Sequence, residues 1–166
     1  MHAPRPVVTA PHGVRLAELA LATGGLALGT GEFASMGLLP YVAATDRVSI
    51  PTMGHMISAY ALGVVIGAPV ITVLLAKAPR RIMLIALMTL FALGNLLSAM
   101  ASTYPMMVAA RFVSGLPHGA YFGLASLVAA SLVPANKRAQ AVGRVMLGLS
   151  VANVIGVPLA TGLGQA

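Results

Sequence analysis

Hydrophobic residues along this chain gather into five long apolar stretches that are separated by short polar connections. Each stretch is long enough for an α-helix to cross a hydrocarbon core of ~30 Å, which takes roughly 20 residues. We predict spans at about residues 19–41, 53–75, 82–102, 106–133 and 145–166. Because the connections are short, neighbouring spans should run antiparallel. The pattern therefore predicts an all-α membrane protein with five transmembrane helices.

The composition supports this class and excludes others. The chain is 58% hydrophobic and only 8% charged, whereas an ordinary soluble domain is about 25% charged. A net charge of +7 raises nucleic acid as a partner, but the basic residues form no single stripe and no aromatic platform accompanies them. The absence of cysteine excludes disulfides and cysteine-based metal sites. We expect no nucleic acid, no metal and no cofactor.

The basic residues follow the topology of the predicted spans. Only Arg47, beside Asp46, falls on one side of the membrane, and eight basic residues fall on the other. These eight are Arg5, Arg15, Lys77, Arg80, Arg81, Lys137, Arg138 and Arg144. The positive-inside rule then places the N-terminus in the cytoplasm. Residues 1–15 are expected to be a short disordered cytoplasmic tail, and residues 16–166 a partial transmembrane bundle.

Two ionisable residues of the fourth span lie on one helical face. At 100° per residue, Arg111 and His118 are only about 20° apart. Arg111 is about 9 Å from the outer end and His118 about 20 Å, just past the midplane. Arg111 either anchors the helix by reaching outward or helps a nearby acid to lose its proton. His118 cannot reach the surface, so it is either a neutral imidazole bonded to another helix or part of a proton relay.

The first span carries a carboxylate near the midplane. Glu32 is about 14 Å from the outer end at Tyr41, and intramembrane carboxylates are expensive and usually functional. Glu32 is therefore a candidate proton carrier, with Arg111 or His118 as partner; otherwise it stays protonated and bonds a neighbouring helix. Glu18 is expected to be an interfacial charge. Asn153 in the fifth span either bonds a neighbouring helix or lines a cavity.

Small residues recur at intervals of four in the fourth and fifth spans. Such ribbons allow the backbones of two membrane helices to approach closely. The fourth span carries Gly115, Gly119 and Gly123. The fifth carries Gly148, Ala152, Gly156, Ala160 and Gly164, with Pro158 predicted to kink the helix.

Three stretches resemble the major facilitator superfamily, in its drug:proton antiporter branch. Arg111 with Gly115, Gly119 and Gly123 is similar to the fourth-helix motif, and "GEFASMGLLPYV" resembles the first-helix motif of exporters. "GLSVANVIGVPLATGLG" resembles the fifth-helix antiporter motif, with matches at Gly148, Gly156, Pro158, Gly162 and Gly164. Within the branch, the chain looks most like the arabinose efflux permeases, with chloramphenicol-resistance and nucleoside exporters next.

The loop between the second and third spans matches that family in part. Its basic positions are present as Lys77, Arg80 and Arg81. Ala76 stands at the position that is usually acidic, and Pro79 at one that is usually glycine. The three basic residues either belong to this loop motif or only obey the positive-inside rule.

The resemblance implies five helices of an N-terminal six-helix bundle that works by alternating access. It implies a proton-coupled secondary transporter in the bacterial inner membrane that exports a sugar or drug. Glu32 would carry the proton, Arg111 would modulate its release, and His118 would line the cavity.

The chain looks incomplete, because the sixth span and the C-terminal half are missing. We expect residues 1–166 alone not to transport. The alternative is a non-transporting truncated membrane module or assembly partner. No catalytic constellation supports an enzyme.

Overall fold

Five long helical segments follow the five apolar stretches. The computed structural model describes residues 11–165, and these contain helices and no strand. The long segments are α1 (Pro11–Gly37), α4 (His55–Leu74), α5 (Arg80–Ala99), α6 (Tyr104–Ser131) and a segment built from α7 (Arg138–Val151), η2 (Ala152–Gly156) and α8 (Val157–Gly164). The prediction of an all-α fold is confirmed.

The connections are more ordered than the sequence suggested. Residues 42–52 were predicted as a loop, but the chain forms α2 (Leu39–Thr45) and α3 (Ile50–Met53) there. Each of these helices has a proline in its first turn, Pro40 in α2 and Pro51 in α3. Proline suits this position, because the backbone N–H that it lacks would have no partner within the helix there. The hydroxyl of Ser49 caps α3 by accepting a hydrogen bond from the Thr52 amide at 3.2 Å. A third short helix, η1 (Ala135–Lys137), precedes α7.

The predicted N-terminal tail is partly wrong. Residues 1–10 lie outside the described part of the chain, but residues 11–15 belong to α1. Proline is favoured in the first turn of a helix, because its missing N–H would be unpaired there anyway. Pro11 is the first described residue of α1, and a proline there is compatible with the first turn of a helix.

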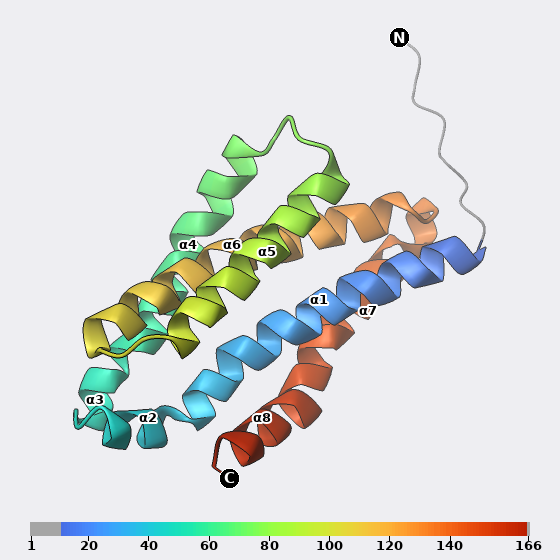
Figure 1. Cartoon of the computed structure of the whole chain (residues 1–166). Helices are drawn as coiled ribbons and strands as arrows, with labels where there is room; N and C mark the ends of the chain where they lie inside the picture. The colour runs from blue at the N-terminus through green and yellow to red at the C-terminus, as the bar shows by residue number, and fades with distance from the viewer. Residues whose placement is uncertain (1–10, 166) are drawn as a thin grey trace.

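Four helices within the described range are long and apolar enough to cross a membrane. They cover Ile50–Leu74, Arg80–Ala99, Tyr104–Ser131 and Ala135–Gly164. α1 has 27 residues but is not among the four, since glycine, threonine and two glutamates lower its hydropathy. It nevertheless lies along α7 and α8 within the bundle (Figure 1). The membrane crossing of α1 stays a prediction.

Helix α6 occupies the centre of the bundle. It packs against α4 on one side and α5 on the other, and it also meets α7 and α1. Buried side chains such as Leu28 of α1, Leu87 of α5 and Val145 of α7 join residues of α6 in one apolar core. This arrangement brings side chains of α1 and α4 to the same stretch of α6.

The two ends of the bundle differ in charge. The start of α1, the α4–α5 connection and the α6–α7 connection lie at one end, and α2, α3 and the α5–α6 connection lie at the other (Figure 1). The first end carries seven basic residues, namely Arg15, Lys77, Arg80, Arg81, Lys137, Arg138 and Arg144. We call it the basic end. The opposite end carries Asp46 and Arg47.

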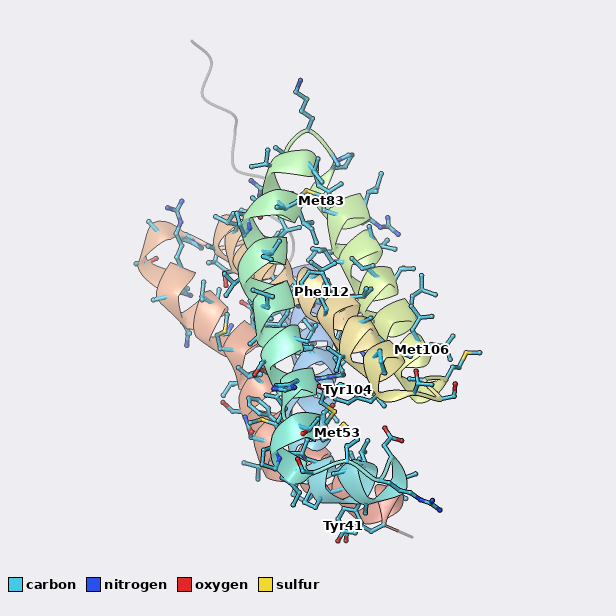
Figure 2. The ribbon with its side chains drawn as sticks, turned by 90° about the vertical axis from the view of Figure 1, so that its left-hand side faces the viewer. Tyr41, Met53, Met83, Tyr104, Met106 and Phe112 are labelled. Carbon is cyan, nitrogen blue, oxygen red and sulfur yellow. The ribbon has the colours of Figure 1, made fainter. Side chains whose placement is uncertain are left out.

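An aromatic side chain fixes the start of α6 at the end opposite the basic one. The Tyr104 hydroxyl donates to the Thr52 carbonyl at 3.2 Å and lies 2.6 Å from Nδ1 of His55. Met53 and Tyr104 lie at this same end in Figure 2. The connection between α3 and α4 is thereby held against α6.

The fifth long segment contains a π-helical turn at Ala152–Gly156. Pro158 follows it, and a proline ring clashes with the carbonyl four residues earlier in a regular α-helix. A widened turn relieves that clash, and π-turns of this kind bend helices. The irregularity that the sequence predicted at Pro158 therefore lies in the turn just before it.

Candidate functional site

The ionisable residues of α1 and α6 meet in the interior of the bundle. Oε2 of Glu32 lies 3.8 Å from Nε2 of His118. Both side chains keep limited contact with solvent, since the Glu32 side chain is 30% exposed and the His118 side chain is 13% exposed. At 3.8 Å the two atoms are too far apart for a direct hydrogen bond, and they form an ion pair only when the imidazole is protonated.

The other nitrogen of the His118 ring pairs with a residue of α4. The Tyr60 hydroxyl lies 2.8 Å from Nδ1 of His118, which is a short hydrogen bond. The two rings stand edge to face, with centroids 5.8 Å apart and an interplanar angle of 84°. His118 therefore bridges Tyr60 on α4 and Glu32 on α1.

Arg111 completes the cluster from one side. Its guanidinium carbon lies 4.4 Å from the centroid of the Tyr60 ring, within the range of a cation–π interaction. Nη1 donates to the carbonyl oxygen of Gly31 at 3.4 Å, and Nε has no hydrogen-bond partner among the described residues. Arg111 is only 3% exposed. It therefore does not act as an anchor that reaches for the outer surface.

Four side chains from three helices thus form one polar cluster, which we call the Glu32 cluster: Glu32, Tyr60, Arg111 and His118. It combines a carboxylate, an imidazole, a phenol and a guanidinium inside an apolar bundle. A carboxylate with an adjacent imidazole can accept and release a proton, and an arginine beside them offsets negative charge.

Tyr60 was not identified from the sequence. Its apolar neighbours in α4 gave no sign of a polar role. One signal was present, since a tyrosine hydroxyl placed deep in a bilayer needs a hydrogen-bond partner. Tyr60 is 2% exposed, so that rule applies to it.

Asn153 does not join the Glu32 cluster. It lies in the π-helical turn, is exposed, and its side-chain amide donates to the Leu149 carbonyl of its own segment at 3.3 Å. Asn95 of α5 likewise donates to its own helix, at the Phe91 carbonyl.

Two of the three glycines in the fourth predicted span pack against α4. A Cβ atom at Gly115 would overlap the main chain of Tyr60, and one at Gly119 would lie 2.8 Å from Cβ of Ala68. Glycines of α4 complete the contact, since Gly63 and Gly67 face the main chain of α6. Gly123 is exposed and has no such neighbour within 4 Å. The close α4–α6 approach therefore includes Gly115 and Gly119 but not Gly123.

Two of the predicted glycines of the fifth segment, Gly148 and Gly156, pack against α1. Gly148 packs on the main chain of Ala22, and Gly156 packs on the side chain of Thr30. Gly162 has no neighbour within 4 Å, and Pro158 is exposed. The packing prediction therefore fits Gly148 and Gly156 and not Gly162.

Glu18 differs from the prediction of an interfacial charge. It is only 4% exposed and accepts a hydrogen bond from Nη1 of Arg144 at 2.9 Å. Its second oxygen, Oε1, has no partner among the described residues. A buried carboxylate needs a paired cation. Glu18 is therefore a link between α1 and α7.

The predicted loop residues lie at the basic end. Nη1 of Arg80 donates to the Ser131 hydroxyl at 3.2 Å, which joins the start of α5 to the end of α6. Lys77 and Arg81 are exposed. Among the described residues the loop holds no acidic side chain that would pair with them.

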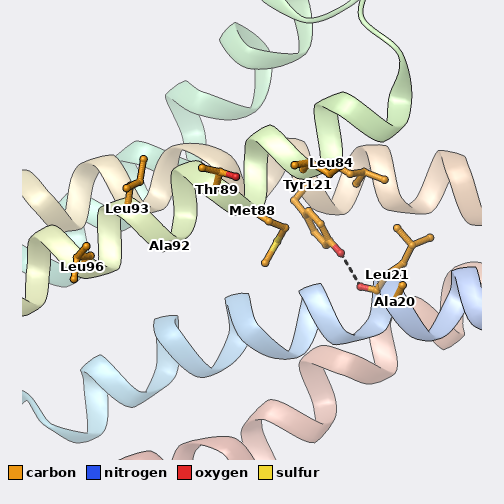
Figure 3. Close-up of a pocket in the computed structure, with 10 residues that line it drawn as sticks. Ala20, Leu21, Leu84, Met88, Thr89, Ala92, Leu93, Leu96 and Tyr121 are labelled. Atoms are coloured by element: carbon orange, nitrogen blue, oxygen red, sulfur yellow. Dashed lines mark hydrogen bonds between the residues drawn. The ribbon is translucent and has the colours of Figure 1, made fainter.

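An open groove of about 580 Å³ lies between α1 and α5. Figure 3 shows Tyr121 among the lining residues, and its hydroxyl donates to the Leu21 carbonyl at 2.9 Å. Its lining side chains are almost all apolar and include no charged residue. The groove is thus apolar, unlike the Glu32 cluster, and none of the four cluster residues lines it. The described residues also contain no group of three or more metal-binding side chains.

The comparisons with known proteins identify the family of the chain. A profile of the Major Facilitator Superfamily matches residues 21–166. The inner membrane transport protein YdhP of Escherichia coli K12 is 53% identical over 147 residues, which cover 89% of this chain and 38% of YdhP. AraJ of the same strain is 42% identical over 89% of this chain and 37% of its own length.

A resistance protein is also similar. The chloramphenicol resistance protein of Streptomyces lividans is 37% identical over 144 residues, which cover 87% of this chain and 37% of that protein. The chain thus spans less than two fifths of the length of these relatives. Its family and its relatives indicate a multi-pass membrane protein of a transporter type rather than an enzyme. The chain belongs to the Major Facilitator Superfamily.

Proposed function

We propose that a transporter containing this chain exports a small organic solute in exchange for protons, with Glu32 as the proton-carrying group. The observation that carries the proposal is the position of Glu32, a partly solvated carboxylate beside His118 inside an apolar bundle. A charged carboxylate is costly inside an apolar bundle, so gaining or losing a proton there changes the free energy of the protein strongly. Binding and release of a proton there can bias a conformational equilibrium.

Arg111 is proposed to modulate proton release. Its guanidinium lies between the Tyr60 ring and the carbonyl of Gly31. Gly31 is the residue that directly precedes Glu32 in the chain. A positive charge nearby favours the proton-free carboxylate. His118 is proposed to line the substrate cavity and to interact with Glu32.

Sugars and drugs are the proposed substrate classes. One relative is named a chloramphenicol resistance protein and another a sugar efflux transporter. The site is proposed to face alternately inward and outward, with the N-terminus and the basic end in the cytoplasm of a bacterial cell with an inner membrane.

A second bundle is a proposed partner of this chain. Alternating access needs two bundles that move about a shared site, and the chain spans 38% of the length of YdhP. Residues 1–166 alone are therefore proposed not to transport. Export by this chain alone in vesicles would contradict that statement and would favour a different mechanism.

The test uses the Glu32→Gln variant of the longer transporter in everted membrane vesicles. Chloramphenicol and arabinose serve as probes, and a pH-sensitive dye reports substrate-induced proton movement. We expect proton movement to be abolished, because glutamine cannot carry a proton. Glu18→Gln is the matched control on the same helix, and it should retain coupling. Normal substrate-induced proton movement in Glu32→Gln would overturn the proposal.

A further inference from the structure

The His118 ring is held between two different partners, one at each nitrogen. The Tyr60 hydroxyl lies 2.8 Å from Nδ1, and Oε2 of Glu32 lies 3.8 Å from Nε2. Tyr60 belongs to α4 and Glu32 to α1, and each of them lies at a different ring nitrogen of His118. What Tyr60 does at Nδ1 therefore decides what Glu32 meets at Nε2.

A neutral imidazole carries one proton, so one nitrogen is a donor and the other an acceptor. If the Tyr60 hydroxyl donates to Nδ1, the proton lies on Nε2 and points toward Glu32. In the opposite tautomer Nε2 would present a lone pair to a carboxylate, which is unfavourable when that carboxylate is charged. A hydrogen-bond partner at one ring nitrogen commonly sets the state of the other in this way.

The Tyr60 hydroxyl is well placed for this task. The side chain is 2% exposed, and its hydroxyl has His118 as its hydrogen-bond partner among the described residues. The guanidinium of Arg111 lies over its ring, and the His118 ring meets its edge. These contacts restrain the phenol, so the hydroxyl stays directed at Nδ1.

We infer that Tyr60 is a positioning residue of this site, which selects the His118 tautomer whose Nε2–H faces Glu32. This donor favours the proton-free form of Glu32. The link to transport rests on the proposed function, whereas the tautomer itself does not.

Few other groups act on this pair. Arg111 faces it from α6 along with His118, and Tyr60 faces it from α4. The polar neighbour from α5 is Asn95, which lies close to Gly31. Its amide carries no charge. The described part of α7, η2 and α8 brings no charged side chain to Glu32, since Arg144 pairs with Glu18 far along α1.

The tautomer is measured directly by NMR on the 166-residue chain in lipid nanodiscs, with ¹⁵N-labelled histidine. The shifts of the two ring nitrogens tell the Nε2–H tautomer from the Nδ1–H tautomer. The His118 signal is assigned by its loss in His118→Asn. We expect the Nε2–H tautomer in the native chain and a clear shift toward a mixture in Tyr60→Phe.

A second histidine–tyrosine pair supplies the control. His55 and Tyr104 form a second histidine–tyrosine hydrogen bond, at 2.6 Å, near the end of the bundle, in which Nδ1–H of His55 donates because the Tyr104 hydroxyl already donates to the Thr52 carbonyl. Tyr104→Phe should change the His55 signal and leave that of His118 unchanged. A native His118 with the proton on Nδ1, or a His118 signal that Tyr60→Phe does not change, would overturn the inference. The first of these results needs no variant to fold.

The transport arm uses the pH profile of export in the longer protein. Tyr60→Phe should keep export but move its pH midpoint upward by up to about one unit, the scale of a weakened electrostatic contact between Nε2–H of His118 and the Glu32 carboxylate. An unchanged profile would contradict the role of Tyr60 in coupling. If Glu32→Gln loses coupling while the Tyr60→Phe profile is unchanged, the inference fails and the proposed function stands. If Glu32→Gln keeps normal coupling, the proposed function itself fails.

Discussion

The guanidinium carbon of Arg111 lies 4.4 Å from the centre of the Tyr60 ring, so a residue of α6 covers the face of a residue of α4. The same guanidinium donates to the Gly31 carbonyl of α1. One buried cation therefore connects the three helices that supply the Glu32 cluster.

Arg111→Lys should weaken this connection although it keeps the positive charge. Lysine is a compact point charge that lacks the planar group of arginine and cannot both stack on Tyr60 and reach Gly31. We expect a loss of about 1–2 kcal/mol in the free energy of unfolding, the scale of a desolvated cation–π contact. Unfolding in mixed micelles measures this loss. A variant as stable as the native chain would show that the charge alone matters.

Gly115→Ala should disrupt the approach of α4 to α6. The added methyl group would overlap the main chain of Tyr60, and such overpacking typically costs about 1–3 kcal/mol. Gly123→Ala, on the same helix, is the matched control, because no neighbour lies within 4 Å of its Cβ position. Thermal unfolding in detergent compares the two, and equal losses would contradict the packing described above.

Arg144→Ala should destabilise the chain more than the double variant Arg144→Ala with Glu18→Gln. The single change leaves the buried Glu18 carboxylate without its cation, and such an uncompensated charge costs about 3–5 kcal/mol. The half-exposed position of Arg144 reduces this figure. A double-mutant cycle of unfolding free energies measures the difference. Additive effects of the two changes would mean that the pair contributes no coupling energy.

The orientation of the bundle can be tested with single cysteines, because the chain has none of its own. Ala76 and Ser49 are exposed positions at opposite ends of the bundle. In intact cells a membrane-impermeant maleimide should label Ser49→Cys and leave Ala76→Cys unlabelled. The reverse pattern would place the basic end outside.

The sequence allowed the long helices to be predicted because each apolar stretch has the length that a bilayer demands. The shared face of Arg111 and His118 followed from the helical repeat, since both lie on α6. Glu32 was chosen because a carboxylate is costly at its depth. These inferences depend on one helix at a time.

Relations between helices were harder to predict. In lipid both faces of a helix are apolar, so the hydrophobic pattern does not fix its rotation. The partner of Glu18 lies 126 positions away in the chain, and Tyr60 is 58 positions from His118. Gly123 continues the regular spacing of Gly115 and Gly119 but lies beyond the contact with α4, because two helices that cross diverge from each other.

The π-helical turn affects the phase of the whole last segment. In an α-helix, positions four apart drift by about 40° per step, so the residues from Gly148 to Gly164 would soon rotate away from α1. A π-turn advances by a smaller angle per residue, and Gly148 and Gly156 both still meet α1, while Gly164 meets Leu38 just beyond its end. The widened turn thus acts as an azimuthal correction that keeps Gly148 and Gly156 directed at α1, which runs parallel to this segment.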